Sequence, residues 1–459
     1  MSSTPSQVLI IGAGVLGLST ARALLQRPNY SNTTITILDA ASELPNATSA
    51  SADTSRILRA DYAVKPYARL VSEAQALWKD VSSNGWGGQG RYHEARLVLT
   101  EQSGTDGHVD GYLRDSLENV KVLAASGQYS FKPQHLRELQ GKDAIRQETG
   151  FPGVSGTMGY VNDNCGWVDA NACVKFAYDS LKEAGERIKI RPNARVRRLI
   201  YEQPTTTHHD APHCRGVELE DGSSVHADLV IVAAGAWSPS LVDLRGQAMA
   251  TGQVLAYLDL SEAEQKALAS NPVYFNVSRG MFMLPPHNRE LKLGRHGFGY
   301  QNPAKVSLAT GAGKTTHALV SIPRTDLPVP AEAEAACREF LVELFPQFKK
   351  RKFTKTRVCW YCDTPSGDFL IDYHPHSKGL FIATGDSGHA FKVFPIIGEK
   401  VVDAIEGHLE NELQELWSWK KDAHKTFDGT SDGTRGGKRG LILEDEWEKS
   451  GLLLPLSRL

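Results

Sequence analysis

The chain has 459 residues, of which 41% are hydrophobic and 23% charged, and its formal net charge is −2. This length suits roughly two or three domains, and the absence of a long basic stripe argues against a nucleic-acid partner. Six scattered cysteines argue against a disulfide scaffold. No apolar run approaches membrane-spanning length, so we expect neither a membrane partner nor a signal peptide.

The first predicted elements are two strands with a helix between them. The run VLIIGAGVLGLSTA is an apolar strand that leads into Gly12-x-Gly14-x-x-Gly17 and a helix, and the next strand ends at Asp39. This order is typical of a Rossmann dinucleotide site. Gly12 permits the sharp turn, Gly14 lets a pyrophosphate approach the helix N-terminus, and Gly17 lets helix and strand pack closely. Asp39 is predicted to bind ribose hydroxyls.

Two later segments repeat this strand-and-small-residue pattern, at 227–238 and 379–405. The second strand is followed by a Gly/Ser turn and by a helix that begins around Phe394. The fingerprint alone does not distinguish FAD from NAD. Three small-residue segments that can approach a cofactor closely, spread over nearly the whole chain, suit the long FAD molecule better than NAD. The residues that we expect to contact it in these segments are Gly235, Gly385, Ser387 and Gly388.

The predicted fold class is α/β. We expect a discontinuous Rossmann-type FAD-binding domain, a second, mostly antiparallel α+β substrate domain, and a tail. The FAD-binding domain is predicted to comprise 1–85, 150–240 and 345–425, the substrate domain 86–149 and 241–344, and the tail 426–459. The chain is expected to be a monomer.

Cys359 and Cys362 form a C-x-x-C pair among aromatic residues. This spacing is typical of metal binding or redox exchange. No second cysteine or histidine pair lies at a suitable distance in the sequence, so we expect no metal site. On spacing alone, both cysteines are interpreted as buried structural residues.

Four runs carry a resemblance to a known family: DTSRILRADY, LKLGRHGFG, RVCWYCDTP and TGDSGHAFK. Over nearly its whole length, the chain resembles the monomeric sarcosine oxidase family of FAD-dependent amine oxidases. This family includes pipecolate oxidases, fungal fructosyl amino acid oxidases (amadoriases) and fungal saccharopine oxidases, of which the last are most similar in these runs.

The resemblance implies roles for particular residues. Cys359 would form a thioether with the flavin 8α-methyl group, with Arg357 as a nearby charge that favours its thiolate. Lys292 would lie beneath flavin N5 and promote the reaction with oxygen. Lys392 would pair with the substrate carboxylate.

Further residues are expected around the same site. Arg56 and His296 match family residues that line it, and Arg59 would share a face with Arg56 if that segment is helical. Phe282 stands where sarcosine oxidases have a tyrosine, and amadoriases have a lysine in place of Arg56. Both differences argue against sarcosine and against a typical amadoriase substrate.

The predicted function is therefore an FAD-dependent oxidase of secondary amino acids. A hydride would pass from the substrate C–N bond to the flavin, the imine would hydrolyse, and O2 would be reduced to hydrogen peroxide. A saccharopine-like substrate is favoured, with Arg435 in a tail folded over the entrance to meet its far end. N-methyl, cyclic (pipecolate) and fructosyl amino acids are the alternative substrates, with specialised metabolism as an alternative role. An FAD dehydrogenase and a non-catalytic flavoprotein are the rival functions.

The sequence ends with Ser457, Arg458 and Leu459. This is a variant of the address read by the peroxisomal import receptor. We expect a peroxisomal protein, with the cytoplasm as the alternative, and a mobile Gly-rich segment at 429–440 that presents the address.

Overall fold

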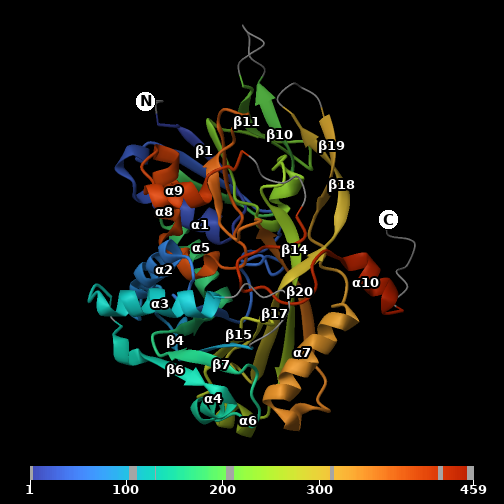
Figure 1. Ribbon diagram of the computed structural model, residues 1–459. Coiled ribbons are helices and arrows are strands. Elements are labelled where there is room, and N and C mark those ends of the chain that lie inside the picture. Colours follow the sequence, from blue (N-terminus) through green and yellow to red (C-terminus); the bar gives the residue numbers. More distant parts are fainter. Residues whose placement is uncertain are drawn as a thin grey trace.

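The computed structural model describes residues 4–102, 111–129, 131–202, 211–310, 315–421 and 427–451. Two large sheets form two halves of the molecule, with β1 in the upper half and β7 and β15 in the lower half (Figure 1). None of the described helices is long and apolar enough to cross a membrane. The address at 457–459 lies outside the described residues and stays a prediction.

The upper sheet has six strands in the order β21-β22-β13-β1-β2-β9. All neighbours are parallel except β21, which runs antiparallel to β22. The middle strands are almost continuously buried, as expected for a parallel sheet covered on both faces, so the predicted Rossmann unit is confirmed. The bounds of its strands are β1 Gln7–Ile11, β2 Thr34–Leu38, β9 Ile188–Arg191, β13 Leu229–Val232, β21 Leu370–Tyr373 and β22 Leu380–Thr384.

The lower sheet has nine strands, in the order β20-β14-β17-β16-β15-β5-β7-β6 with β23 paired to β17. Most pairs are antiparallel as predicted, but β15 is parallel to β5 and β23 is parallel to β17. The bounds of its strands are β5 Leu97–Glu101, β6 Leu136–Gln140, β7 Met158–Asn162, β14 Met249–Asp259, β15 Val273–Asn276, β16 Met281–Met283, β17 Glu290–Gln301, β20 Lys355–Asp363 and β23 Leu441–Ile442.

The remaining strands of the described chain form three smaller sheets. They comprise β3 Arg56–Leu58, β8 Gly166–Val168 and β4 Tyr92–Glu94; β10 Val196–Glu202, β11 His213–Leu219 and β12 Ser224–His226; and β18 Pro303–Ala309 with β19 Thr315–Ser321.

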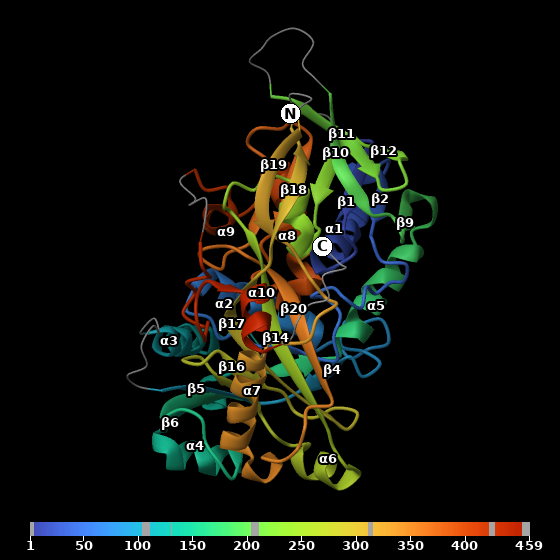
Figure 2. The ribbon, with the colours of Figure 1, turned by 90° about the vertical axis from the view of Figure 1, so that its right-hand side faces the viewer.

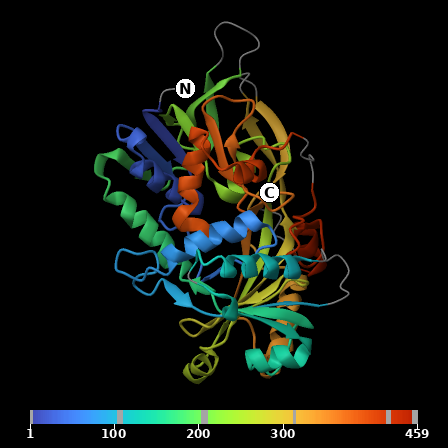
Figure 3. The same ribbon diagram turned by 60° about the vertical axis from the view of Figure 1, so that its left-hand side comes forward.

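Helices surround both sheets. Helix α1 packs against α5 and α8 beside the upper sheet, α7 packs against β17 and β14 of the lower sheet, and α2 and α3 lie between the two halves (Figures 1 and 3). The α-helices are α1 Val15–Gln26, α2 Lys65–Trp78, α3 Tyr112–Ala125, α4 Gly141–Thr149, α5 Ala170–Lys182, α6 Glu262–Leu268, α7 Ala331–Leu344, α8 Phe394–Glu406, α9 Asn411–Trp417 and α10 Leu443–Lys449. The 3-10 helices are η1 Pro28–Tyr30, η2 Pro133–His135, η3 Gly185–Arg187, η4 Gly235–Ser240, η5 Pro346–Phe348 and η6 Ala390–Val393.

Two strands lie in a different sheet from the one that the predicted boundaries imply. Strand β7 falls within 150–240 and β20 within 345–425, yet both belong to the lower sheet. Strand β20 pairs along its whole length with β14 (Figure 2). The pairing depends on a partner about a hundred residues earlier in the chain, which the local sequence does not reveal. As a result, Cys359 is held by the lower sheet.

The prediction of a mobile segment at 429–440 was wrong. Thr430, Thr434 and Arg435 are buried, and Gly436 forms a parallel bridge with Gly297 of β17. The Thr430 hydroxyl donates a 2.9 Å hydrogen bond to the carbonyl of Thr364. The polar side chains of this segment therefore anchor it to the lower sheet despite its high glycine content.

Candidate functional site

A cavity of about 780 Å³ opens at the carboxyl ends of β1, β2 and β13. This is the edge at which open α/β sheets bind nucleotides, and the volume is in the usual range for cofactor sites. Gly12, Gly14, Asp39, Gly235 and Gly388 all line it, as predicted.

The local geometry at β1 and α1 fits a bound pyrophosphate. Gly14 is the N-cap of α1 and has no side chain to cap the helix, and no acidic residue lies in its first turn. The Ser51 hydroxyl accepts a 3.1 Å hydrogen bond from the Val15 amide. The helix N-terminus is therefore suited to an anion. The Asp39 carboxylate accepts a 2.9 Å hydrogen bond from the Ala13 amide and so fixes the loop. A Cβ atom on Gly17 would lie 1.9 Å from the Gly12 carbonyl oxygen, so close packing requires this glycine.

The Gly/Ser turn after β22 contributes differently from the prediction. Gly388 lines the cavity together with Asp386, whereas Gly385 and Ser387 are not among its lining residues. Both have positive φ, 69° at Gly385 and 43° at Ser387, and they shape the turn. The Ser387 hydroxyl accepts a 3.2 Å hydrogen bond from the Thr364 amide, which ties the turn to the end of β20.

A second, smaller cavity of about 120 Å³ adjoins the first. The two share Arg56, Tyr361, Gly388 and Phe391 as lining residues. Charged and aromatic side chains predominate in its wall. These include predicted residues, namely Arg56, Arg59, Phe282, Lys292, His296, Cys359 and Lys392.

Arg56 and Arg59 both line this cavity, but not from one helical face. Arg56 is the first residue of the short strand β3, and Arg59 directly follows the last residue of that strand. Arg56 donates to the Asp53 carboxylate, whereas Arg59 donates to the Tyr112 hydroxyl. The sequence had left open whether this segment is helical, and the structure shows that it is not.

Lys292 and Arg56 share one buried carboxylate. The Lys292 ammonium lies 2.7 Å from Asp53 Oδ2 and 2.6 Å from the Ser55 carbonyl oxygen, and the Tyr257 hydroxyl donates to Asp53 Oδ1 at 2.8 Å. Burial lowers the pKa of Lys292 to about 8, although Asp53 opposes this shift. Burial opposes ionisation of Asp53 as well, but Lys292 and Arg56 outweigh it and hold the Asp53 pKa well below its usual range.

Lys392 and Arg59 form the second cationic pair of the small cavity. The Lys392 ammonium lies 5.5 Å from the Tyr62 ring centroid, and the Arg59 guanidinium lies 5.2 Å from the same centroid. Burial, and then the charge of Arg59, lower the pKa of Lys392 well below its usual range. Within the described parts of the chain, neither cation forms an ion pair with a carboxylate. The pair is therefore an electrostatic site for an anion.

The two cysteines of the C-x-x-C pair lie on opposite faces of β20. Cys359 lines the small cavity, whereas Cys362 is buried behind it, 3.2 Å from the Thr384 hydroxyl. Arg56 and Lys292 both interact electrostatically with Cys359. Arg357, the predicted neighbouring charge, instead donates to the carbonyls at positions 49 and 52. Only Cys359 faces the space where a cofactor and a substrate would meet.

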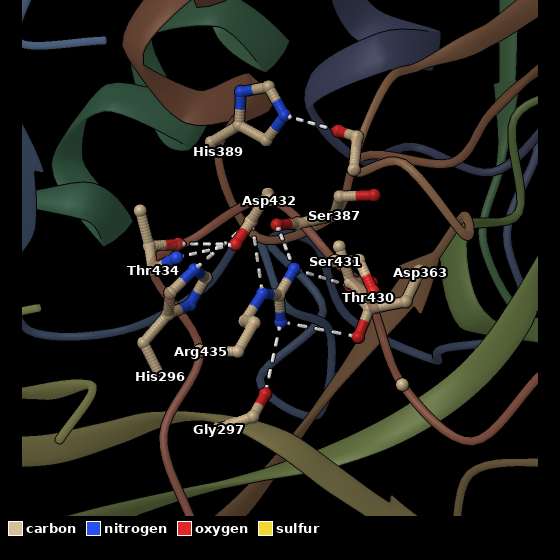
Figure 4. Close-up of polar contacts among 12 residues, drawn as sticks. His296, Gly297, Asp363, Ser387, His389, Thr430, Ser431, Asp432, Thr434 and Arg435 are labelled. Atoms are coloured by element: carbon tan, nitrogen blue, oxygen red, sulfur yellow. Dashed lines mark hydrogen bonds and ion pairs between the residues drawn. The ribbon is translucent and has the colours of Figure 1, made fainter. Parts of the chain in front are cut away.

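Arg435 does not lie at an entrance. Figure 4 shows it within a cluster of polar groups, where it binds Asp363 at 2.9 Å and Asp432 at 3.2 Å and also donates to the Ser387 carbonyl. It is not among the residues that line the small cavity. The sequence alone could not show that the Asp363 carboxylate, at the end of β20, would form an ion pair with the Arg435 guanidinium.

His296 lies at the boundary of this cluster and does line the cavity. Its Nε2 atom is 4.0 Å from Asp432 Oδ2 (Figure 4). Burial and the positive charges of Arg435 and Lys392 lower the pKa of His296 well below its usual range, so its ring is neutral.

Several lining residues had not been identified from the sequence. Three site residues could have been, because Asp53 and Tyr62 lie within the DTSRILRADY run and Tyr361 shares the face of β20 that carries Cys359. The others had no local signal, since they come from separate segments. The unpredicted site residues are Asp53, Tyr62, Tyr67, Tyr112, Phe275, Tyr361, His389, Asp432 and Thr434.

Comparisons with known proteins agree with this geometry. Residues 7–404 match the family model described as FAD dependent oxidoreductase. The amino acid oxidase imqH of Aspergillus flavus is 32% identical over 90% of this chain and 98% of its own length. The L-saccharopine oxidase of Schizosaccharomyces pombe is 28% identical over 90% of this chain and 93% of its own length.

A solved structure shares the fold over nearly the whole chain. The deglycating enzyme fructosamine oxidase from Aspergillus fumigatus (Amadoriase II), in complex with FSA, has a TM-score of 0.77 and 28% identity and covers 96% of each chain. The matching model, the relatives and the nucleotide cavity lead to one conclusion: this chain belongs to the FAD-dependent oxidoreductase family.

Proposed function

We propose that this protein oxidises secondary amino acids and reduces O2 to hydrogen peroxide. The observation that carries the proposal is the buried pair Lys392 and Arg59, which lines a cavity adjoining the cofactor cavity and forms no ion pair with a carboxylate of the described chain. Such a pair is stabilised by an anionic group, and an amino acid supplies a carboxylate at the required place.

FAD, when bound, supplies the hydride acceptor for the substrate C–N bond and the electrons for oxygen. The residues of the chain then have separate tasks. Lys392 and Arg59 orient the substrate through its carboxylate, and aromatic side chains such as Tyr62 and Phe282 exclude water. Lys292 holds a positive charge in the wall of the small cavity, on the same Asp53 carboxylate as Arg56, and this charge favours the formation of reduced oxygen anions. The imine product hydrolyses in water.

The relatives support this class of reaction without fixing one substrate. Their names include an amino acid oxidase, an L-saccharopine oxidase and a fructosamine oxidase. One argument for saccharopine was that Arg435 would bind the far end of the substrate. The structure removes this argument, because Arg435 forms an ion pair with Asp363. The proposed substrate class is therefore a secondary amino acid whose carboxylate is held by Lys392 and Arg59.

The test is an oxygen-electrode and peroxide assay with saccharopine, pipecolate, N-methyl amino acids and fructosyl amino acids. Oxygen uptake with at least one of them, matched by equimolar peroxide, is expected. Anaerobic bleaching of the flavin without oxygen uptake would identify a dehydrogenase. If none of the compounds bleaches the flavin, the proposed activity is wrong.

We also propose that Cys359 attaches the flavin covalently. Its support is the position of Cys359 in the cavity wall, where it interacts electrostatically with Arg56 and Lys292. Flavin should stay with the protein after acid precipitation of the wild type and of Cys362→Ser, and should be released from Cys359→Ser. Retention of flavin by both variants would contradict the assignment.

The peroxisomal address and the monomeric state stay predictions. Deletion of residues 457–459 should move a fluorescent fusion from punctate structures to the cytosol, and an unchanged pattern would contradict the address. Light scattering should give the mass of a single chain.

A further inference from the structure

The wall of the small cavity contains two carboxylates, Asp368 and Asp432, as well as its cations. Asp432 lines the cavity on the side of His296, and its side chain is 20% exposed. Within the described chain, Asp432 does not form an ion pair with Lys392 or Arg59, although all three side chains line the same cavity. The cavity therefore has a cationic part and an anionic part that do not neutralise each other by contact.

Asp432 is held in place by the segment that carries it, residues 430–436, here called the C-terminal strap. Both the backbone amide and the hydroxyl of Thr434 donate to Asp432 Oδ1, each at 2.8 Å. The strap itself is fixed by the buried contact of Arg435 with Asp363 and by a 3.1 Å hydrogen bond from the Gly436 amide to the His296 carbonyl. Asp432 is thus a pre-positioned group, which lowers the entropy cost of using it for recognition.

The second oxygen of Asp432 is only partly satisfied. Asp432 Oδ2 accepts one hydrogen bond, at 3.2 Å, from Arg435 Nε, and the neutral His296 ring lies 4.0 Å away. Arg435 is also shared with Asp363, which it binds at 2.9 Å. A carboxylate oxygen has room for a further donor, so Asp432 retains the capacity to accept a hydrogen bond from a molecule in the cavity.

We propose that Asp432 is a specificity-determining residue that accepts a hydrogen bond from a donor group on the side chain of the substrate. This inference rests on the proposed function, in which Lys392 and Arg59 hold the substrate carboxylate. The donor is a hydroxyl or an ammonium group. A second carboxylate at that end is disfavoured, because it would meet the Asp432 charge in a poorly solvated space.

The test uses matched substrate pairs that differ only in the side-chain donor. N-methyltyrosine against N-methylphenylalanine tests a hydroxyl donor, and Nα-methyllysine against N-methylnorleucine tests an ammonium donor. N-methylglutamate tests the disfavoured carboxylate. In the wild type, kcat/KM is expected to favour the donor member of at least one pair by about 10- to 100-fold, the range for a hydrogen bond to a charged group. The pair that discriminates identifies the donor.

The variant Asp432→Asn keeps the oxygen that binds Thr434 and removes the charge. It should abolish the preference within the discriminating pair, leave the member without a donor nearly unchanged and improve N-methylglutamate. Asp428→Asn is the matched control, since Asp428 is an exposed carboxylate of the same tail that pairs with Arg439 and does not line the cavity. Flavin absorbance and the melting temperature check that each variant is folded.

Two results would overturn the proposal. One is a wild-type enzyme that does not discriminate within either pair, a measurement that needs no variant. The other is an Asp432→Asn enzyme in which kcat/KM falls equally for all five substrates, because that would make Asp432 a structural residue or a partner of the reacting amine. If none of the five compounds reduces the flavin but the enzyme oxidises another secondary amino acid, the proposed function stands and this inference fails.

Discussion

Many lining residues of the large cavity are glycine, alanine, serine or threonine, whereas the small cavity is lined by long cationic and aromatic side chains. The first includes the consecutive strand β1, turn and helix α1, although segments up to Phe391 also line it. The second takes its residues from segments as distant as Arg56 and Asp432. Cofactor binding here depends on how closely the backbone can approach the cofactor. Substrate selection depends on which buried charges do not form an ion pair within the protein.

The most severe test acts on the large cavity alone. Gly17→Val should prevent stable flavin binding, because the new Cβ atom would meet the Gly12 carbonyl oxygen at 1.9 Å and push α1 away from β1. Visible absorbance of the purified protein measures the outcome. Gly407→Ala is the control, since Gly407 has positive φ but open space around it, and the change should cost only about 1–2 kcal/mol of stability. Full flavin content in Gly17→Val would show that close packing is not required.

The next test addresses Lys292, which shares the Asp53 carboxylate with Arg56, a lining residue of both cavities. Lys292→Met should slow reoxidation of the reduced flavin by about 100- to 1,000-fold, the usual cost of removing one preorganised electrostatic group. Flavin binding and reduction by substrate should change much less. Stopped-flow mixing of reduced enzyme with oxygen measures the step directly. Normal reoxidation would remove Lys292 from the oxygen reaction.

A smaller effect is expected from the small cavity alone. Lys392→Met should raise KM for every amino acid substrate by roughly 10- to 100-fold, because it removes a charge-assisted contact with the shared carboxylate. Lys400→Met serves as the control, since Lys400 pairs with Glu410 and does not line either cavity. An unchanged KM in Lys392→Met would place the substrate carboxylate elsewhere.

The last test concerns pH. Burial lowers the pKa of Lys292 to about 8, so its positive charge is present below that pH and is lost as the pH rises through it. The rate of flavin reoxidation should accordingly fall roughly tenfold for each pH unit above 8. Lys292→Arg keeps its charge at all these pH values and should flatten the profile. A wild-type rate that does not change between pH 7 and 10 would contradict this role.

The two cavities also differ in how far the sequence predicts them. Gly12, Gly14 and Asp39 were identified because the turn, the helix and the acidic residue follow one another in the chain. Lys392 and Cys359 were identified only through family resemblance. Asp432 was not identified at all. Arg435 was predicted to bind the substrate, but it forms an ion pair with Asp363, and this pairing depends on tertiary packing. Local patterns encode backbone geometry, whereas the pairing of buried charges is decided by contacts between distant segments.

The position of the C-terminal strap has a consequence for synthesis of the protein. Residues 430–436 supply part of the wall of the small cavity and bind the end of β20. A growing polypeptide on the ribosome can include β1, α1, β2 and β20 before it includes Asp432 and Arg435. Until the strap has been made, Asp363 lacks its ion-pair partner and the small cavity lacks that part of its wall. The substrate cavity is therefore completed only after the strap has been synthesised and packed.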